Sequence, residues 1–179
     1  MSEVESLIQN YRRFAALPWK RNVSGPEKVW FAVYDPSQER RIRLRLDEFR
    51  ITTMEAGHQW HQVDLTDSFA RWMADHRYRE AYFESPEDLE LALPAYENAV
   101  VEQLRAALTA PEVDQDTVVA VVGVGSLFGL TYVSNVVKGC VDYVQGRLLV
   151  FFPGHQEGPN YRLLDARDGW NYLAIPITA

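Results

Sequence analysis

The sequence predicts an α/β fold, a single domain in which a parallel or mixed sheet is flanked by helices and closed by a C-terminal hairpin. Four short runs have strand character: 29–35, 59–65, 117–124 and 147–154. Two of them are continuously apolar and rich in β-branched residues. Segments with helical periodicity lie between these runs. Crossovers of this kind place strands in parallel and cover both faces of the sheet with helices.

The first 27 residues are set apart by their composition. Apolar residues at helical spacing, among them Leu7 and Tyr11, predict an amphipathic helix over residues 2–17. Two prolines and a glycine make residues 18–28 a connector. We therefore divide the chain into an N-terminal helix with its connector, 1–27, and an α/β domain, 28–179.

The segment after the first strand carries signals for both structures. Arginine alternates with Ile and Leu over residues 41–46, which fits a strand. However, Asp35 is a good N-cap, Pro36 suits the first helical position and Gln38 completes a capping box. We therefore expect one helix from Asp35 to Gly57, with an arginine-rich outer face.

The remaining elements follow in order along the chain. Thr66 is expected to cap a helix that runs through His76, and the acidic residues 80–108 form helical material broken by Pro86 and Pro94. A further helix is predicted over 126–144. The chain then ends in two runs around Asp168–Gly169, a dipeptide typical of a hairpin turn.

Composition excludes several classes of function. The 179 residues carry a formal charge of −7, so we expect no direct binding to duplex DNA by the isolated protein. The single cysteine, Cys140, permits neither an internal disulfide nor a cysteine zinc cluster and is expected to be a buried apolar residue. No apolar run is long enough to cross a membrane and the chain starts with polar residues, which indicates a cytoplasmic protein.

The stretch "VVAVVGVGSLFGL" at 118–130 resembles a phosphate-binding loop, because a strand runs into small residues and then a predicted helix. A Walker A loop requires a lysine that is absent, and a dinucleotide fingerprint requires a third glycine where Phe128 stands. Two interpretations remain. Gly123 and Gly125 allow a tight turn and Ser126 caps the helix, or the three residues hold an anion at the helix N-terminus.

Other polar residues invite sharper hypotheses. His58 and His61 are three apart on a strand and point to opposite faces, so we predict no metal site there. No nucleophile elbow surrounds Ser126, and a hydrolase built on Ser126 and His155 is the weakest alternative. Residues 80–104 contain seven acidic residues and no lysine or arginine. This segment is either a solvated helical face or an acidic docking surface for a basic partner.

Several stretches together resemble the BrxB-like family of bacterial BREX phage-defence systems. They are "VWFAVYDP", "AGHQWHQVDLTDSFARWM", "GVGSLFGLTYVSNVV" and "GRLLVFFPGHQEGPNYRLLDARDGWNYLAIPI", which together extend from about residue 28 to the C-terminus. The resemblance implies a non-catalytic component of a multiprotein system. It also implies partners among the other BREX proteins, above all a PglZ-type phosphatase-like protein, and no cofactor.

The C-terminal third supplies the partner-binding candidates. Tyr, Trp and Arg dominate interface energetics, and they concentrate here together with Asp and Asn. The candidates are Tyr161, Arg162, Asp165, Arg167, Asp168, Trp170 and Asn171. The competing interpretation is structural, with the aromatic residues packed and Asp165 paired with Arg167. The alternative function is a degenerate nucleotide- or anion-binding protein that uses Gly123, Gly125 and Ser126.

Overall fold

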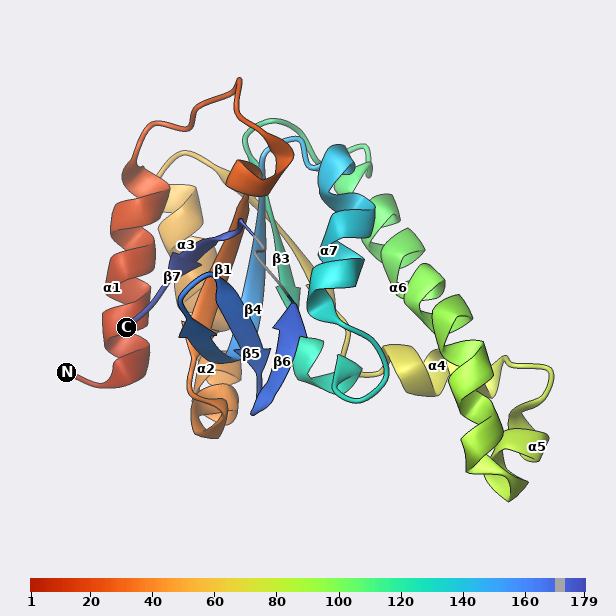
Figure 1. Ribbon diagram of the computed structural model, residues 1–179. Helices are drawn as coiled ribbons and strands as arrows, with labels where there is room; N and C mark the ends of the chain where they lie inside the picture. Colours follow the sequence, from red (N-terminus) through yellow and green to blue (C-terminus); the bar gives the residue numbers. More distant parts are fainter. Residues whose placement is uncertain (170–172) are drawn as a thin grey trace.

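A computed structural model confirms the α/β fold, with helices on both faces of a mostly parallel sheet (Figure 1). The structure describes residues 1–169 and 173–179, and at 167–169 the backbone alone.

Five parallel strands form the centre of the molecule. They are β1 (Val29–Tyr34), β2 (Gln59–Asp64), β3 (Thr117–Val122), β4 (Arg147–Glu157) and β7 (Ile175–Ile177), in the order β2-β3-β4-β1-β7. β4 pairs with β1 on one side and with β3 on the other, so that Leu149 lies between Trp30 and Ala120. The short edge strand β7 contains Pro176, which suits an edge because proline has no N–H to donate.

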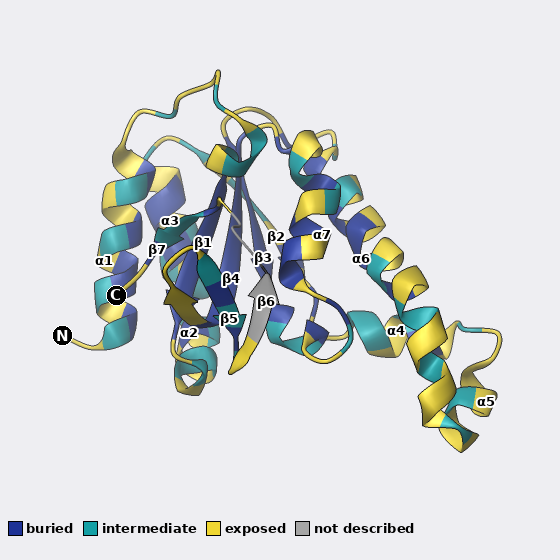
Figure 2. Cartoon of the chain, in the orientation of Figure 1, coloured by how far each residue is buried: buried dark blue, intermediate teal, exposed yellow. Residues whose placement is uncertain are grey.

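The central strands are buried on both faces, and alternation of their side chains creates two separate cores (Figure 2). In β1, Phe31 points to one core, whereas Trp30 points to the other. The same division holds for Phe152 and Phe151 in β4. A continuous apolar run is therefore required, since neither face of these strands meets water.

Helices α1 (Glu3–Ala16) and α3 (Leu46–Glu55) cover the first face. The hydroxyl groups of Tyr11 and Thr53 lie 2.6 Å apart in the buried interface between them. Thr53 also donates to the carbonyl of Phe49, whose ring packs 5.4 Å from that of Tyr11. The N-terminal helix is thus integrated into the core, and Leu7 is fully buried.

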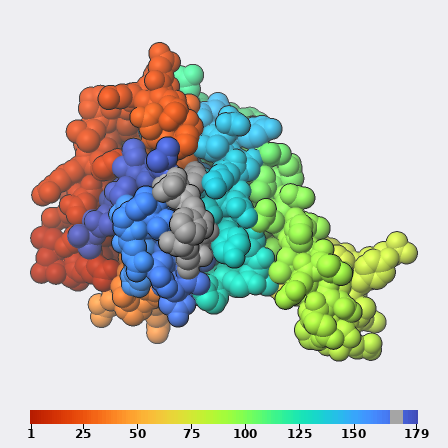
Figure 3. Space-filling view, viewed as in Figure 1, coloured from red at the N-terminus to blue at the C-terminus, as the bar shows by residue number. Residues whose placement is uncertain are grey.

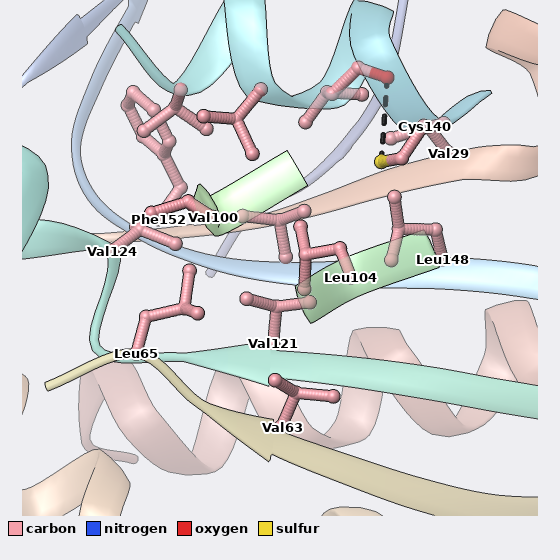
Figure 4. Close-up of a cluster of buried hydrophobic side chains, with 14 of the residues drawn as sticks. Val29, Val63, Leu65, Val100, Leu104, Val121, Val124, Cys140, Leu148 and Phe152 are labelled. Atoms are coloured by element: carbon pink, nitrogen blue, oxygen red, sulfur yellow. Dashed lines mark hydrogen bonds between the residues drawn. The ribbon is translucent and has the colours of Figure 1, made fainter. Parts of the chain in front are cut away.

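Helices α6 (Leu93–Leu108) and α7 (Val133–Cys140) cover the second face (Figure 4). The helices approach closely at Gly139, whose carbonyl accepts a hydrogen bond of 3.0 Å from Arg105 Nε. Cys140 is buried among apolar side chains, which confirms its predicted packing role, and burial raises the pKa of its thiol to about 12.

The helix predicted from Asp35 to Gly57 is correct in type but wrong as a single element. It comprises a 3₁₀ turn, η2 (Pro36–Gln38), followed by α2 (Glu39–Leu44) and α3. Arg45 separates α2 from α3, because its backbone leaves helical geometry at φ −113° and ψ 13°. Asp35 does cap the segment by accepting from the Ser37 N–H at 2.9 Å. The capping box is absent, because the Gln38 side chain contacts Ser37 instead of the Asp35 backbone.

One further helix prediction needs correction. The helix expected at 126–144 is α7 alone, and the positive φ of Gly129 interrupts the backbone before Val133. A 3₁₀ turn, η4 (Val124–Leu127), precedes α7, and η5 (Val141–Tyr143) follows it. The acidic segment is broken near both prolines, as expected: a 3₁₀ turn starts at Pro86, and α6 starts at Leu93 with Pro94 in its first turn, where a proline needs no hydrogen-bonded N–H.

The helix expected after β2 is α4 (Ser68–Ala74), which starts two residues beyond Thr66. It is followed by α5 (Arg79–Glu84) and by η3 (Pro86–Ala92). Another short turn, η1 (Gly25–Lys28), ends the connector before β1.

The C-terminal hairpin is present, but its turn does not lie at Asp168–Gly169. Beyond Pro153, β4 leaves the parallel sheet and pairs antiparallel with β5 (Asn160–Leu163) through a turn at 158–159. β5 pairs in turn with β6 (Ala166–Gly169), and their connection at 164–165 places Leu164 at φ 57°. The Leu164 N–H donates to the carbonyl of Pro153 at 2.8 Å, which fixes this connection against β4.

Replacing Leu7 with Ala should lower the free energy of unfolding by about 2–5 kcal/mol, the usual cost of deleting a buried leucine side chain. Leu44 is 78% exposed, so Leu44→Ala is a matched control that should change stability by less than about 0.5 kcal/mol. Denaturant titration measures both. Equal effects of the two substitutions would contradict an integrated α1.

Candidate functional site

A cleft of about 290 Å³ lies at the carboxyl ends of the parallel strands. In open parallel sheets this edge is where ligands bind. The residues that line it follow β1, β2, β3 and the parallel part of β4, and we call it the carboxyl-edge cleft: Pro36, Glu39, Arg43, Thr66, Gly123, Gly125, Ser126, Pro153 and Leu164.

Arg43 of α2 is the central charged group of this cleft. Its Nε donates to Glu39 at 2.7 Å and its Nη2 donates to Thr66 Oγ1 at 2.7 Å, while Asp64 Oδ2 lies 3.5 Å from Nη1. Glu39 also accepts a hydrogen bond from the Tyr34 hydroxyl. Burial, reinforced by this bond to Glu39, raises the pKa of the Tyr34 phenol well above its usual value. The arginine thus ties α2 to the end of β2.

Asp64 and Thr66 form a tight turn at the end of β2. Asp64 Oδ1 accepts from the Thr66 N–H at 2.9 Å and from the Thr66 hydroxyl at 2.5 Å. Burial alone would raise the pKa of Asp64, but the hydrogen bonds from Thr66 and the charge of Arg43 outweigh it, so the pKa lies below its ordinary value. Asp64 therefore acts as an ionised acceptor that orders the turn.

Gly123 is the point where the turn after β3 meets the turn after β2. Its φ is +81°, and a Cβ built there would lie 2.5 Å from Thr66 Oγ1 and 2.7 Å from the Thr66 nitrogen. Both the backbone conformation and the space require glycine. The contact at Gly125 is looser, since a Cβ atom on residue 125 would lie 3.6 Å from Cγ of Pro153.

Ser126 does not cap a helix, since α7 begins only at Val133. The Ser126 N–H donates to the Gly123 carbonyl at 3.1 Å. Its hydroxyl lies 2.7 Å from that same carbonyl and 2.9 Å from the Leu65 carbonyl. Both donors of Ser126 are therefore directed at protein carbonyls, and the loop ties β3 to the end of β2.

The chemistry that this cleft supports is structural. Its charged groups are paired with one another, and the hydroxyl of its serine is directed at carbonyl groups instead of a histidine. Within the described residues, no hydrogen bond joins Ser126 to His155, which lies on β4 opposite Arg162 and is exposed. This geometry gives no support to the hydrolase hypothesis.

The partner-binding candidates of the C-terminal hairpin have different surroundings. Tyr161 is 2% exposed, packs its ring 4.7 Å from that of Phe31 and donates its hydroxyl to the Ala174 carbonyl, so it belongs to the core. Arg162 is half-buried and approaches Glu157 at 3.5 Å, and its Nη2 donates to the Asp165 carbonyl. The side chains of Arg167 and Asp168, and the whole of Trp170 and Asn171, lie outside the described residues.

The histidines near β2 have separate surroundings. His58 stacks on Trp19, with 3.5 Å between ring centroids, whereas His61 Nδ1 lies 3.6 Å from Glu112. In the part of the chain that the structure describes, no group of three His, Cys, Asp or Glu side chains is placed to hold a metal ion.

A second candidate surface is the segment 74–95, which we call the arm. It projects from the body of the protein beyond α4 (Figure 3), and none of its residues is buried. Large apolar side chains are exposed on it, with Tyr78 at 53%, Phe83 at 69% and Leu91 at 89%. Five acidic residues of its distal part form no ion pair in the described structure: Glu80, Glu84, Glu87, Asp88 and Glu90.

Sequence reasoning selected the glycines and Ser126 of the cleft but missed Arg43 and Glu39. The arginine-rich pattern of this segment predicts a solvated face for Arg43 and its neighbours. The available signal was the combination of Glu39 and Arg43 at a spacing of four residues with an aspartate at the end of the next strand.

Comparisons of the chain with family models, curated proteins and solved structures found no match. Of the helices in the described residues, none combines the length and apolar character needed to cross a lipid bilayer.

Replacing Gly123 with Ala should lower the free energy of unfolding by about 2–4 kcal/mol, because left-handed backbone strain adds to overpacking against Thr66. Gly129 is the matched control, since its φ is +76° but a built Cβ has nothing within 4 Å. Gly129→Ala should cost only the strain, about 1–2 kcal/mol. Thermal unfolding measures the difference, and an equal cost at both positions would refute the close approach of the two turns.

Replacing Asp64 with Asn should lower stability at pH 7 by up to about 1 kcal/mol, because the partly exposed carboxylate loses its attraction to Arg43. The folded pKa of Asp64 is depressed, so its contribution is present above the ordinary carboxyl pKa and is lost as the pH falls through the lowered value. The difference between the melting temperatures of the two proteins should therefore shrink as the pH falls below the ordinary carboxyl pKa of about 4. A constant difference from pH 7 to acid would contradict this assignment.

Proposed function

We propose that this protein is a non-catalytic interaction component of a BREX-type phage-defence system, acting in the cytoplasm as an adaptor. The resemblance of its sequence to the BrxB-like family suggests the system, with a PglZ-type phosphatase-like protein as the partner. The observation that carries an interaction role is the arm.

The arm exposes large apolar side chains to solvent. A segment of this length normally contributes residues to a core, because burial of apolar side chains offsets the entropy of ordering the chain. Here every residue from 74 to 95 is exposed or half-buried, and Phe83 and Leu91 face solvent. Exposed aromatic and aliphatic side chains of this kind mark binding sites for other proteins.

The charge of the arm indicates the character of the partner surface. The arm contains six acidic residues and two arginines, Arg77 and Arg79, and its part beyond Arg79 contains five acidic residues and no basic one. Among the described residues these five form no ion pair. Glu97 and Glu102, the other acidic residues of 80–104, lie on α6 outside the arm. The arm thus favours a basic surface with an apolar pocket, and attraction between opposite charges would speed association at low salt.

The double substitution Phe83→Ser and Leu91→Ser should weaken binding to a purified PglZ-type protein by at least about tenfold, or ~1.4 kcal/mol, while thermal stability stays unchanged. Leu44→Ser is the control, since it also removes an exposed leucine side chain but lies on α2. Surface plasmon resonance at two salt concentrations measures affinity, and added salt should weaken the wild-type complex.

Three outcomes would count against this proposal. Undiminished binding by the arm variant would exclude the arm as the contact surface. If Arg162→Ala lowered affinity in its place, the hairpin would be the docking surface. Failure of the wild-type protein to bind any PglZ-type protein would remove the proposed partner.

A further inference from the structure

A polar pocket of about 370 Å³ lies at the opposite edge of the sheet, where the parallel strands begin. In Figure 1 this is the upper edge, beneath the connector that precedes η1. Its lining comes from the connector and from residues that precede or start β1, β2, β3 and β4: Trp19, Arg21, Asn22, Lys28, His58, Gln115, Asp116, Gln145 and Arg147.

Arg147 is a buried cation without a carboxylate partner. It is 6% exposed, and its guanidinium lies 5.0 Å from the ring centre of Trp19 and 5.8 Å from that of Trp30. Its hydrogen bonds go to the carbonyls of Gly146 and Lys20, each at 2.9 Å. No carboxylate of the described residues lies within ion-pair distance of it. Buried charges in proteins are normally paired with an opposite charge.

The mouth of the pocket adds further positive charge. Arg21 and Lys28 line it, and Lys28 Nζ donates to the Val144 carbonyl at 3.4 Å, its one hydrogen bond among the described residues. Asp116 is the one carboxylate among the lining residues, and it lies 3.8 Å from Arg21. Three cationic side chains therefore face a single acid, in a protein whose formal net charge is −7.

Two polar atoms beside this pocket lack partners. The stacked rings of Trp19 and His58 both line it, and neither Trp19 Nε1 nor His58 Nδ1 has a hydrogen-bond partner among the described residues. Unsatisfied buried polar atoms are rare in folded proteins and each requires an explanation. Both occur here, next to the unpaired Arg147.

We propose that this pocket is a binding site for a phosphate group, either free phosphate or a small phosphate monoester. Arg147 supplies a fixed positive charge at the base, and the guanidinium N–H groups that the Gly146 and Lys20 carbonyls do not use can donate to the oxygens of a tetrahedral anion. Arg21 and Lys28 close over the anion from the mouth. The volume accommodates a phosphate together with a small organic group. This site is independent of the arm and of the proposed partner.

Isothermal titration of the whole protein with inorganic phosphate, and separately with glycerol 3-phosphate, tests the site against sodium chloride at matched ionic strength. Binding of both ligands identifies the phosphate group itself as the ligand, and binding of the monoester alone shows that the pocket also contacts the organic part. If neither ligand binds at up to about 10 mM, where even a site of millimolar affinity would be occupied, the proposal is overturned.

The double substitution Arg21→Gln and Lys28→Gln should weaken phosphate binding by at least about tenfold without lowering the melting temperature. Arg147 itself is left in place because it also ties the connector to β4. The control is Arg40→Gln with Lys138→Gln, which removes two exposed positive charges elsewhere and should change affinity by less than about twofold. An equal loss in the control would mean non-specific attraction and would refute the pocket.

Discussion

The burial of both faces of β1, β3 and β4 is the constraint on which the rest of the structure depends. Apart from Thr117 and Arg147 at their starts, these strands are apolar throughout the parallel sheet, and alternation of their side chains contributes to two cores at once. Two layers of helices are then needed to keep water from the sheet. The N-terminal helix belongs to one of those layers, although a proline-containing connector separates it from the rest of the sequence.

The strands β1 to β4 were predictable from sequence, whereas the C-terminal strands and the ends of the helices were not. A run such as 117–122 leaves little choice but a buried strand, because it is rich in β-branched residues and too short for a core helix. Helix ends depended on local conformation that periodicity does not reveal. Arg45 interrupts one expected helix, and the positive φ at Gly129 interrupts the backbone before another. The turn expected at Asp168–Gly169 lies elsewhere because Gly158 and Leu164 take the positive φ angles.

Some residues of the carboxyl-edge cleft could be predicted from the sequence, whereas the contact between its charged residues could not. Its glycines and Ser126 stood out because small residues after a strand allow close approach of the backbone. Arg43 and Asp64 were separated by 21 residues, and the contact between them exists only because β2 and α2 end at the same edge. Because Arg43 is paired with Asp64 and bonded to Thr66, its charge holds α2 against the end of β2 instead of facing a ligand. At the other edge no acid of the described residues pairs with Arg147, and this contrast distinguishes the two ends of the sheet.

The length of β4 has a structural consequence. Its first seven residues are hydrogen-bonded into the middle of the parallel sheet, and the same strand continues without a break into the antiparallel pair with β5. At Gly154 the strands β4 and β5 approach so closely that a Cβ atom on residue 154 would lie 1.9 Å from the carbonyl oxygen of Arg162. The hairpin is therefore a direct continuation of the central strand, without an intervening loop. Its position relative to the sheet is set by β4 itself and by the Leu164 N–H, which donates to the Pro153 carbonyl.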